Sequence, residues 1–191
     1  MGLDIFIHTK PFMDPTAPTQ EDHRLSRYFC NLMCLWDINS DLKQIEDISG
    51  IDLLPLYHML QYVYLEEDEI EFYLEEEAVS KSDRRGVLRD IRKGKKILEN
   101  NIDKVLQTVT ELIEKLNQVE DLPWSLASTY SEYMATKENS YFSHFTIDTE
   151  DIDKGKDNNF GQDLRNFKRF LEYAKNCGVT TVWFGFGGLF A

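Results

Sequence analysis

Two of the four histidines lie on predicted strands and are the side chains best suited to acid–base chemistry. His8 shares a strand face with Asp4, and His144 shares one with Thr146. Adjacent strands would bring these groups together at one end of a sheet, as a polar cluster fit for proton transfer or for a metal ion. Surface-facing residues commonly produce the same pattern. Asp4, His8 and His144 are therefore candidate catalytic residues only under the alternative hypothesis, a hydrolase-type enzyme.

Metal and cofactor motifs are missing from the sequence. No histidine pair has the HExxH spacing and no CxxC is present, so we predict no metal site. Cys30 and Cys34 are four residues apart on one helix face, which would suit metal binding or redox sensing. Unpaired cysteines usually pack as small hydrophobic residues, and we expect that here. No GxSxG, Walker or kinase motif is present, and we expect no cofactor.

The composition is that of a folded acidic domain. The chain has 191 residues, 42% of them hydrophobic, with 21 Lys and Arg against 34 Asp and Glu and a net charge of −13. This balance argues against general binding to nucleic acid or to an anionic membrane. No apolar run is long enough to span a bilayer, and the N-terminus lacks the basic region of a signal peptide. With an odd number of cysteines, three, the chain is expected in the cytoplasm.

The elements that would position the candidate residues begin with an alternating strand over residues 3–8. After a proline-rich loop, Thr19 resembles a helix cap, and an apolar stripe predicts a helix from there to about Trp36. Ser40 is expected to cap a short helix through Ile48, which Gly50 would end. Asp52 is the expected cap of the next helix, with Pro55 in its first turn.

Residues 52–118 carry the clearest periodicity. Positions that are alternately four and three residues apart, mostly apolar, form a first helical seam. A polar stretch at 80–82 interrupts it. A second seam continues the heptad spacing over nine positions, which predicts one helix from about 83 to 118. The first seam consists of Leu56, Leu60, Val63, Glu67, Ile70 and Leu74, and the second of Leu88, Ile91, Lys95, Leu98, Ile102, Val105, Val109, Leu112 and Leu116. The two seams predict a long antiparallel helical hairpin that turns near Lys81.

The charges of this predicted hairpin complement each other. Folding at Lys81 places Glu67 opposite Lys95, which are the two charged seam positions. The acidic run 66–77 then lies along the basic segment 81–96. We interpret this as a register-setting zipper, since isolated exposed ion pairs stabilise by only ~0–1 kcal/mol. The alternatives are a cation site or an acidic mimic of nucleic acid.

The C-terminal part reads as a possible helix over 125–137, a strand over 141–147, a helix around 164–174 ended by Gly178, and a strand over 179–186. Strand, helix and strand predict a right-handed parallel βαβ unit. We therefore expect a helix-rich mixed α+β fold with a small sheet of at least three strands. Residues 1–191 would form a single domain, with 52–118 as a helical hairpin inserted between the first strand and helices and the βαβ unit.

The opening residues Met1-Gly2-Leu3-Asp4-Ile5-Phe6 resemble the start of a group of uncharacterised bacterial and phage-borne proteins that begin Met-Gly-Leu-Asp. The segment Arg24-Leu25-Ser26-Arg27-Tyr28-Phe29 is similar to the basic and aromatic helix that often follows in that group. The similarity covers about a seventh of the chain. That group has no established activity, so the resemblance assigns no functional residue.

Without a catalytic signature, the leading hypothesis is a non-catalytic protein-interaction or accessory module, from a mobile element or a bacterial accessory locus. The predicted hairpin offers a large surface for a protein partner or for self-association. We expect no nucleic-acid partner and no membrane partner. The hydrolase alternative requires Asp4, His8 and His144 to converge in a concave pocket.

Overall fold

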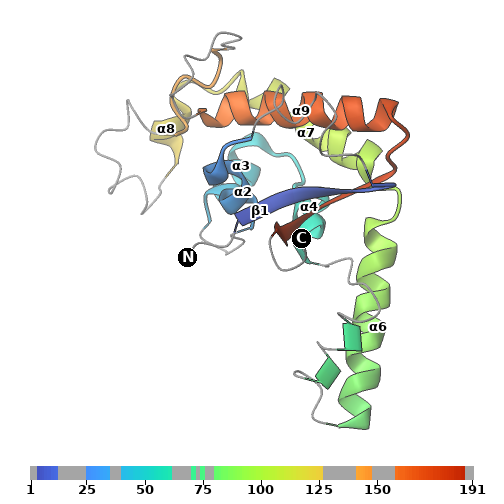
Figure 1. Cartoon of the computed structure of the whole chain (residues 1–191). Coiled ribbons are helices and arrows are strands. Elements are labelled where there is room, and N and C mark those ends of the chain that lie inside the picture. The colour runs from blue at the N-terminus through green and yellow to red at the C-terminus, as the bar shows by residue number, and fades with distance from the viewer. Residues whose placement is uncertain are drawn as a thin grey trace.

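A computed structural model describes residues 4–12, 25–34, 40–61, 70–71, 74–75, 80–126, 141–147 and 158–187, and the helix predicted over 125–137 lies largely outside them. Most of the described residues are helical, and two strands complete the fold (Figure 1). The elements are β1 (Asp4–Lys10), α2 (Arg27–Cys34), α3 (Asp41–Ser49), α4 (Leu54–Gln61), α6 (Lys81–Leu98), α7 (Ile102–Leu116), α8 (Leu122–Ser125), α9 (Phe160–Asn176) and β2 (Thr181–Gly187). The expected helix-rich mixed α+β fold is confirmed.

In the described residues the sheet has two strands, so the prediction of at least three is not supported. β1 and β2 pair antiparallel, with Asp4 opposite Gly187 and Lys10 opposite Thr181. The predicted parallel βαβ unit is wrong, because residues 141–146 form successive turns. The backbone of this segment bonds to a helix instead of to a strand. Arg165 of α9 donates to the carbonyls of Phe145 (2.9 Å) and Ile147 (2.6 Å).

Gly161 explains why these turns lie so close to α9. A Cβ at this position would stand 2.1 Å from the carbonyl oxygen of Phe145, which is backbone and cannot move aside. Glycine is therefore needed for the approach of the 141–147 segment, hereafter the aromatic turn, to the first turn of the helix. Phe142 and Phe145 are buried there, and both rings lie against Phe160. The aromatic residues whose spacing predicted a strand pack against α9 instead.

The predicted cap of the first short helix is confirmed, whereas the predicted cap of the next, Asp52, lies one residue before the cap position. The Ser40 hydroxyl accepts from the N–H of Lys43 at the start of α3, and Gly50 ends that helix with a φ of 68°. The Asp52 carboxylate accepts from the N–H of Leu54, and Pro55 lies in the first turn of α4.

The start of α2 differs from the prediction. Leu25 and Ser26 are not helical, and the Ser26 hydroxyl accepts from the N–H of Phe29 at 3.1 Å. Ser26 therefore caps this helix, and Thr19, the expected cap, lies outside the described residues. A serine three residues before an apolar helical position carries the same signal as the one that identified Ser40 correctly.

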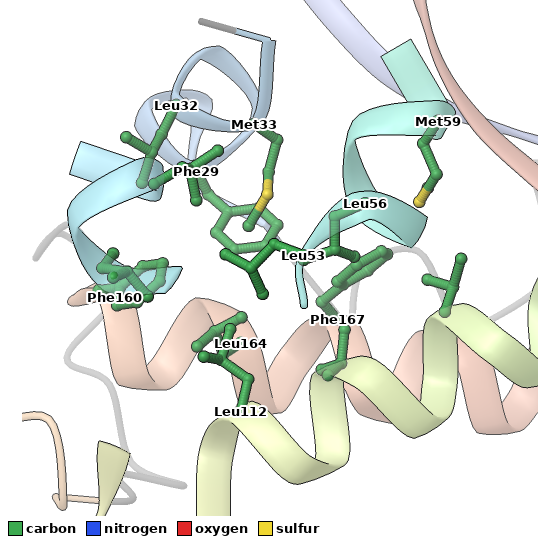
Figure 2. Close-up of a cluster of buried hydrophobic side chains, with 14 of the residues drawn as sticks. Phe29, Leu32, Met33, Leu53, Leu56, Met59, Leu112, Phe160, Leu164 and Phe167 are labelled. Atoms are coloured by element: carbon green, nitrogen blue, oxygen red, sulfur yellow. The ribbon is translucent and has the colours of Figure 1, made fainter. Parts of the chain in front are cut away.

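The core lies between two groups of helices (Figure 2). α7 and α9 run side by side along one side, and α2, α3 and α4 face them from the other (Figure 1). Apolar side chains from both groups meet there, and the large ones are fully or almost fully buried. They include Phe29, Leu32, Met33, Leu53, Leu56, Met59, Leu112, Phe160, Leu164 and Phe167. The sheet closes the core through Val182 and Phe184 of β2.

The predicted single helix over 83–118 is wrong, because the chain bends between α6 and α7. Asn100 takes a left-handed φ of 56°, a conformation that asparagine tolerates better than most residues. The Asn101 side chain then donates to the carbonyl of Val182 and accepts from the N–H of Val182, both at 2.8 Å and both buried. Its amide group thus pairs with β2 as the backbone of a third strand would.

The bend also changes what the heptad seam packs against. From Leu98 onward the seam is buried in the core, where α7 packs against α9. Before the bend, Leu88 and Ile91 are only half-buried, and α6 leaves the body of the molecule (Figure 1). α4, which begins the first predicted arm, contacts both α6 and α7, and α7 also packs against α9.

The first arm of the predicted hairpin lies largely outside the described residues. Leu74 is buried, and the Arg84 guanidinium pairs with the Glu71 carboxylate, so acidic and basic segments do meet at this point. Lys95 is half-buried on α6, whereas Glu67 lies outside the described residues. The Glu67–Lys95 pair and the hairpin register stay predictions.

Replacing Asn101 by Ala should lower the free energy of unfolding by about 2–4 kcal/mol. The change leaves the buried N–H and carbonyl of Val182 without their partner, and each such loss costs about 1–3 kcal/mol. Urea denaturation followed by circular dichroism measures the effect. The matched control is Asn117→Ala at the exposed other end of α7, for which a change within about 0.5 kcal/mol is expected. Equal effects of the two changes would contradict the role of Asn101.

Candidate functional site

His8 lies opposite Trp183 in the sheet, and the two rings stack with centroids 5.4 Å apart. A Cβ on Gly185 would come within 2.7 Å of the His8 Nε2 atom, so the imidazole lies over this glycine. His8 is half-buried on β1, where its ring stacks on the Trp183 indole and lies over Gly185.

His144 lies in a different environment. It is exposed in the aromatic turn, with a φ of 56°, beside residues of α8. The reason for expecting it next to His8 was a strand over 141–147, and that strand is absent. The side chain of Asp4 lies outside the described ones, so the full cluster of Asp4, His8 and His144 stays a prediction. In the described part of the chain, no three His, Cys, Asp or Glu side chains are grouped to hold a metal ion.

Cys30 packs in the core as expected. Its side chain is 7% exposed, and burial raises the pKa of the thiol to about 11. A thiol with such a pKa is protonated at neutral pH and is a poor nucleophile or metal ligand. The side chain of Cys34 lies outside the described ones.

A buried carboxylate, Asp163, is the polar site that the sequence did not predict. It is 0% exposed in the first turn of α9 and accepts four hydrogen bonds from three separate segments. The donors are the Ser26 N–H (2.9 Å), the Ser26 hydroxyl (2.5 Å), the Tyr141 hydroxyl (2.5 Å) and the Asn158 amide (2.8 Å). One signal was present in the sequence. Asp163 precedes Phe167 by four residues and so falls on the apolar stripe of the helix.

Asp163 is a structural anchor rather than a reactive group. Burial raises its pKa above the ordinary value, and the hydrogen bonds from Ser26 and Tyr141 partly offset this. Burial and the nearby Asp163 charge raise the pKa of Tyr141 well above its ordinary value, so the phenol stays a donor. The carboxylate has no exposed surface for a substrate. It ties the start of α2 and the aromatic turn to α9.

The outer face of α6 is the most distinctive surface. Six of its exposed side chains, at spacings of three and four residues, are basic, and the other exposed ones described are Asp83 and Asp90. Apart from a 3.7 Å contact of Arg89 with Asp90, none of these cations forms an ion pair within the described structure. We call this surface the cationic face; it consists of Lys81, Arg85, Arg89, Arg92, Lys93 and Lys96.

The helix that carries the cationic face differs in net charge from the remaining chain. α6 holds eight of the 21 Lys and Arg and two of the 34 Asp and Glu, so its charge is +6 and that of the remaining chain is −19. Its half-buried apolar side chains include Leu88, which borders this face, and Ile91, which lies farther around the helix. The helix thus presents a strip of positive charge about 25 Å long.

Changing Asp163 to Asn should alter the pH dependence of stability in one direction. Because the native pKa of Asp163 is raised, its contribution to stability is present below the ordinary aspartate pKa and is lost as pH rises through the native pKa. The unfolding free energy of Asp163→Asn minus that of the wild type should therefore rise between about pH 4 and pH 7. Denaturant unfolding at both pH values tests this.

Tyr141→Phe provides the opposite control. It removes a hydrogen bond that lowers the Asp163 pKa, so that pKa should rise further. As pH rises, the unfolding free energy of Tyr141→Phe should therefore fall more than that of the wild type. That of Asp163→Asn should fall less. If the unfolding free energy of each variant differs from that of the wild type by the same amount at all pH values, the raised pKa assigned to Asp163 is contradicted.

The described helices are each too short or too polar to cross a bilayer. Comparison of the chain with protein-family models, curated proteins and solved structures found no match. Function is therefore inferred from the charge and geometry of the described surfaces, and the cationic face of α6 is the most distinctive of them.

Proposed function

We propose that this protein is a protein-interaction module that binds an acidic protein surface through the cationic face of α6. The observation that carries the proposal is the line of six exposed basic side chains on a helix that stands away from an acidic body (Figure 1). Exposed charges of one sign steer a partner of opposite charge and fix its orientation. The face matches an acidic helix or strip of similar length.

The attachment of α6 supports this role. Leu98 is fully buried, and Asn101 holds the end of the helix on β2, so the cationic face has a defined direction. A pre-oriented helix loses less entropy on binding than a flexible basic segment. The six basic side chains of the cationic face are exposed, which leaves them accessible to a partner.

An acidic protein fits better than nucleic acid. A duplex carries one negative charge per about 1.7 Å and continues beyond a helix of this size. It would then meet the remaining chain, whose charge is −19. An acidic protein strip ends where the cationic face ends and avoids this repulsion. The Arg84–Glu71 pair already shows one carboxylate docked on the same helix.

A synthetic helical peptide with Glu at every fourth position serves as the probe. It should bind the full-length protein in low salt and weaken as salt rises. Lys93→Ala/Lys96→Ala should weaken binding about 3- to 10-fold, since each exposed pair contributes about 0.2–1 kcal/mol. The matched control is Lys104→Ala/Lys115→Ala on α7, which removes the same charge from exposed positions. Equal weakening by the two double variants would refute the assignment of binding to α6.

Duplex DNA and RNA should bind more weakly than the acidic peptide at the same ionic strength. Fluorescence anisotropy with labelled 20-base-pair duplexes at low and moderate salt measures this. A dissociation constant near micromolar that depends steeply on salt, and that is lost in Arg85→Ala/Arg89→Ala/Arg92→Ala, would identify a nucleic-acid site and overturn the proposal.

A further inference from the structure

A groove of about 290 Å³ lies between α8 and the aromatic turn. Its volume is near the lower end of the range for ligand pockets. Buried apolar residues that line it include Leu122, Phe142 and Phe145. It lies at the opposite end of the molecule from α6, since α8 and α6 are widely separated in Figure 1. The groove is thus independent of the cationic face.

Two of its lining side chains suit a positive charge. Asp121 is exposed and forms no ion pair with any residue that the structure describes. Trp124, three residues further along, is 61% exposed, which is unusual for the most hydrophobic of the aromatic side chains. A carboxylate and an indole face are the two groups that recognise ammonium and guanidinium ions in proteins.

The backbone around the groove is unusual. Among described non-glycine residues, positive φ values occur at Asn100, Asp121 and His144, and the last two line the groove. Such conformations persist where the surrounding structure enforces them, and they concentrate at binding sites. They place Asp121 and His144 on the two sides that form the groove.

We infer that this groove binds a basic side chain, lysine or arginine, of a partner peptide. The methylene stem would lie along the apolar lining, since long basic side chains pack their stems on apolar surface. The charged end would meet the Asp121 carboxylate and the Trp124 ring. The exposed Ile147 beside the groove, at 47%, extends the apolar surface on which the peptide would lie.

The probes are the N-acetyl methylamides of lysine and arginine, titrated into the full-length protein at about pH 8, where an ordinary histidine is neutral. The Trp124 indole N–H signal in a nitrogen-15 correlation spectrum reports binding, and Trp124→Phe assigns that signal. We expect millimolar binding of both probes. The neutral analogue with norleucine and the acidic analogue with glutamate should bind at least fivefold more weakly.

Asp121→Asn should weaken binding of the lysine probe at least fivefold. Asparagine tolerates the left-handed φ of 54° at this position, so the fold is retained. The matched control is Glu120→Gln, which removes the same charge from the adjacent exposed residue that does not line the groove, and a change below twofold is expected. Lys93→Ala/Lys96→Ala on α6 should have no effect. Binding of norleucine as tight as that of lysine, or equal weakening by Asp121→Asn and Glu120→Gln, would overturn the inference.

Discussion

The pairing of the Asn101 side chain with the backbone of Val182 is the interaction on which the arrangement of this molecule depends. It satisfies one buried N–H and one buried carbonyl of β2, and it stops the helix that the apolar pattern would otherwise continue. The N–H of Ile102, the first residue of α7, also donates to the carbonyl of Thr180. These bonds direct α7 onto α9 and leave α6 projecting from the body.

A second buried polar group joins parts of the chain that hydrophobic contacts alone would position loosely. Asp163 collects donors from before α2, from the aromatic turn and from the segment preceding α9. Burying a carboxylate is costly, and complete hydrogen bonding compensates for it. Hydrophobic packing is non-directional, whereas these bonds fix which segments meet. The groove beside α8 depends on this node, because Tyr141 begins the turn that forms one of its walls.

The consequence for function is a separation of charge. α6 carries a charge of +6, whereas the remaining chain carries −19. The basic side chains of the cationic face are exposed on α6, whereas Arg84, which lies outside this face, pairs with Glu71. The two surfaces that we propose to bind partners, the cationic face and the groove with Asp121, lie far apart on the molecule.

The sequence by itself determined the local elements: the cap at Ser40, the helix ended by Gly178, β1, β2 and the basic character of α6. These follow from short-range rules of capping and periodicity. Tertiary structure decided where the heptad seam stops and how residues 141–147 fold. The seam runs unbroken through Leu98 and Ile102, so its spacing does not predict a bend. The bend depends on the hydrogen bonds of Asn101 with Val182, which is 81 residues away in the sequence. Likewise, the sequence of the aromatic turn resembles a strand, but Gly161 allows it to approach α9 closely and Arg165 donates to its carbonyls at Phe145 and Ile147.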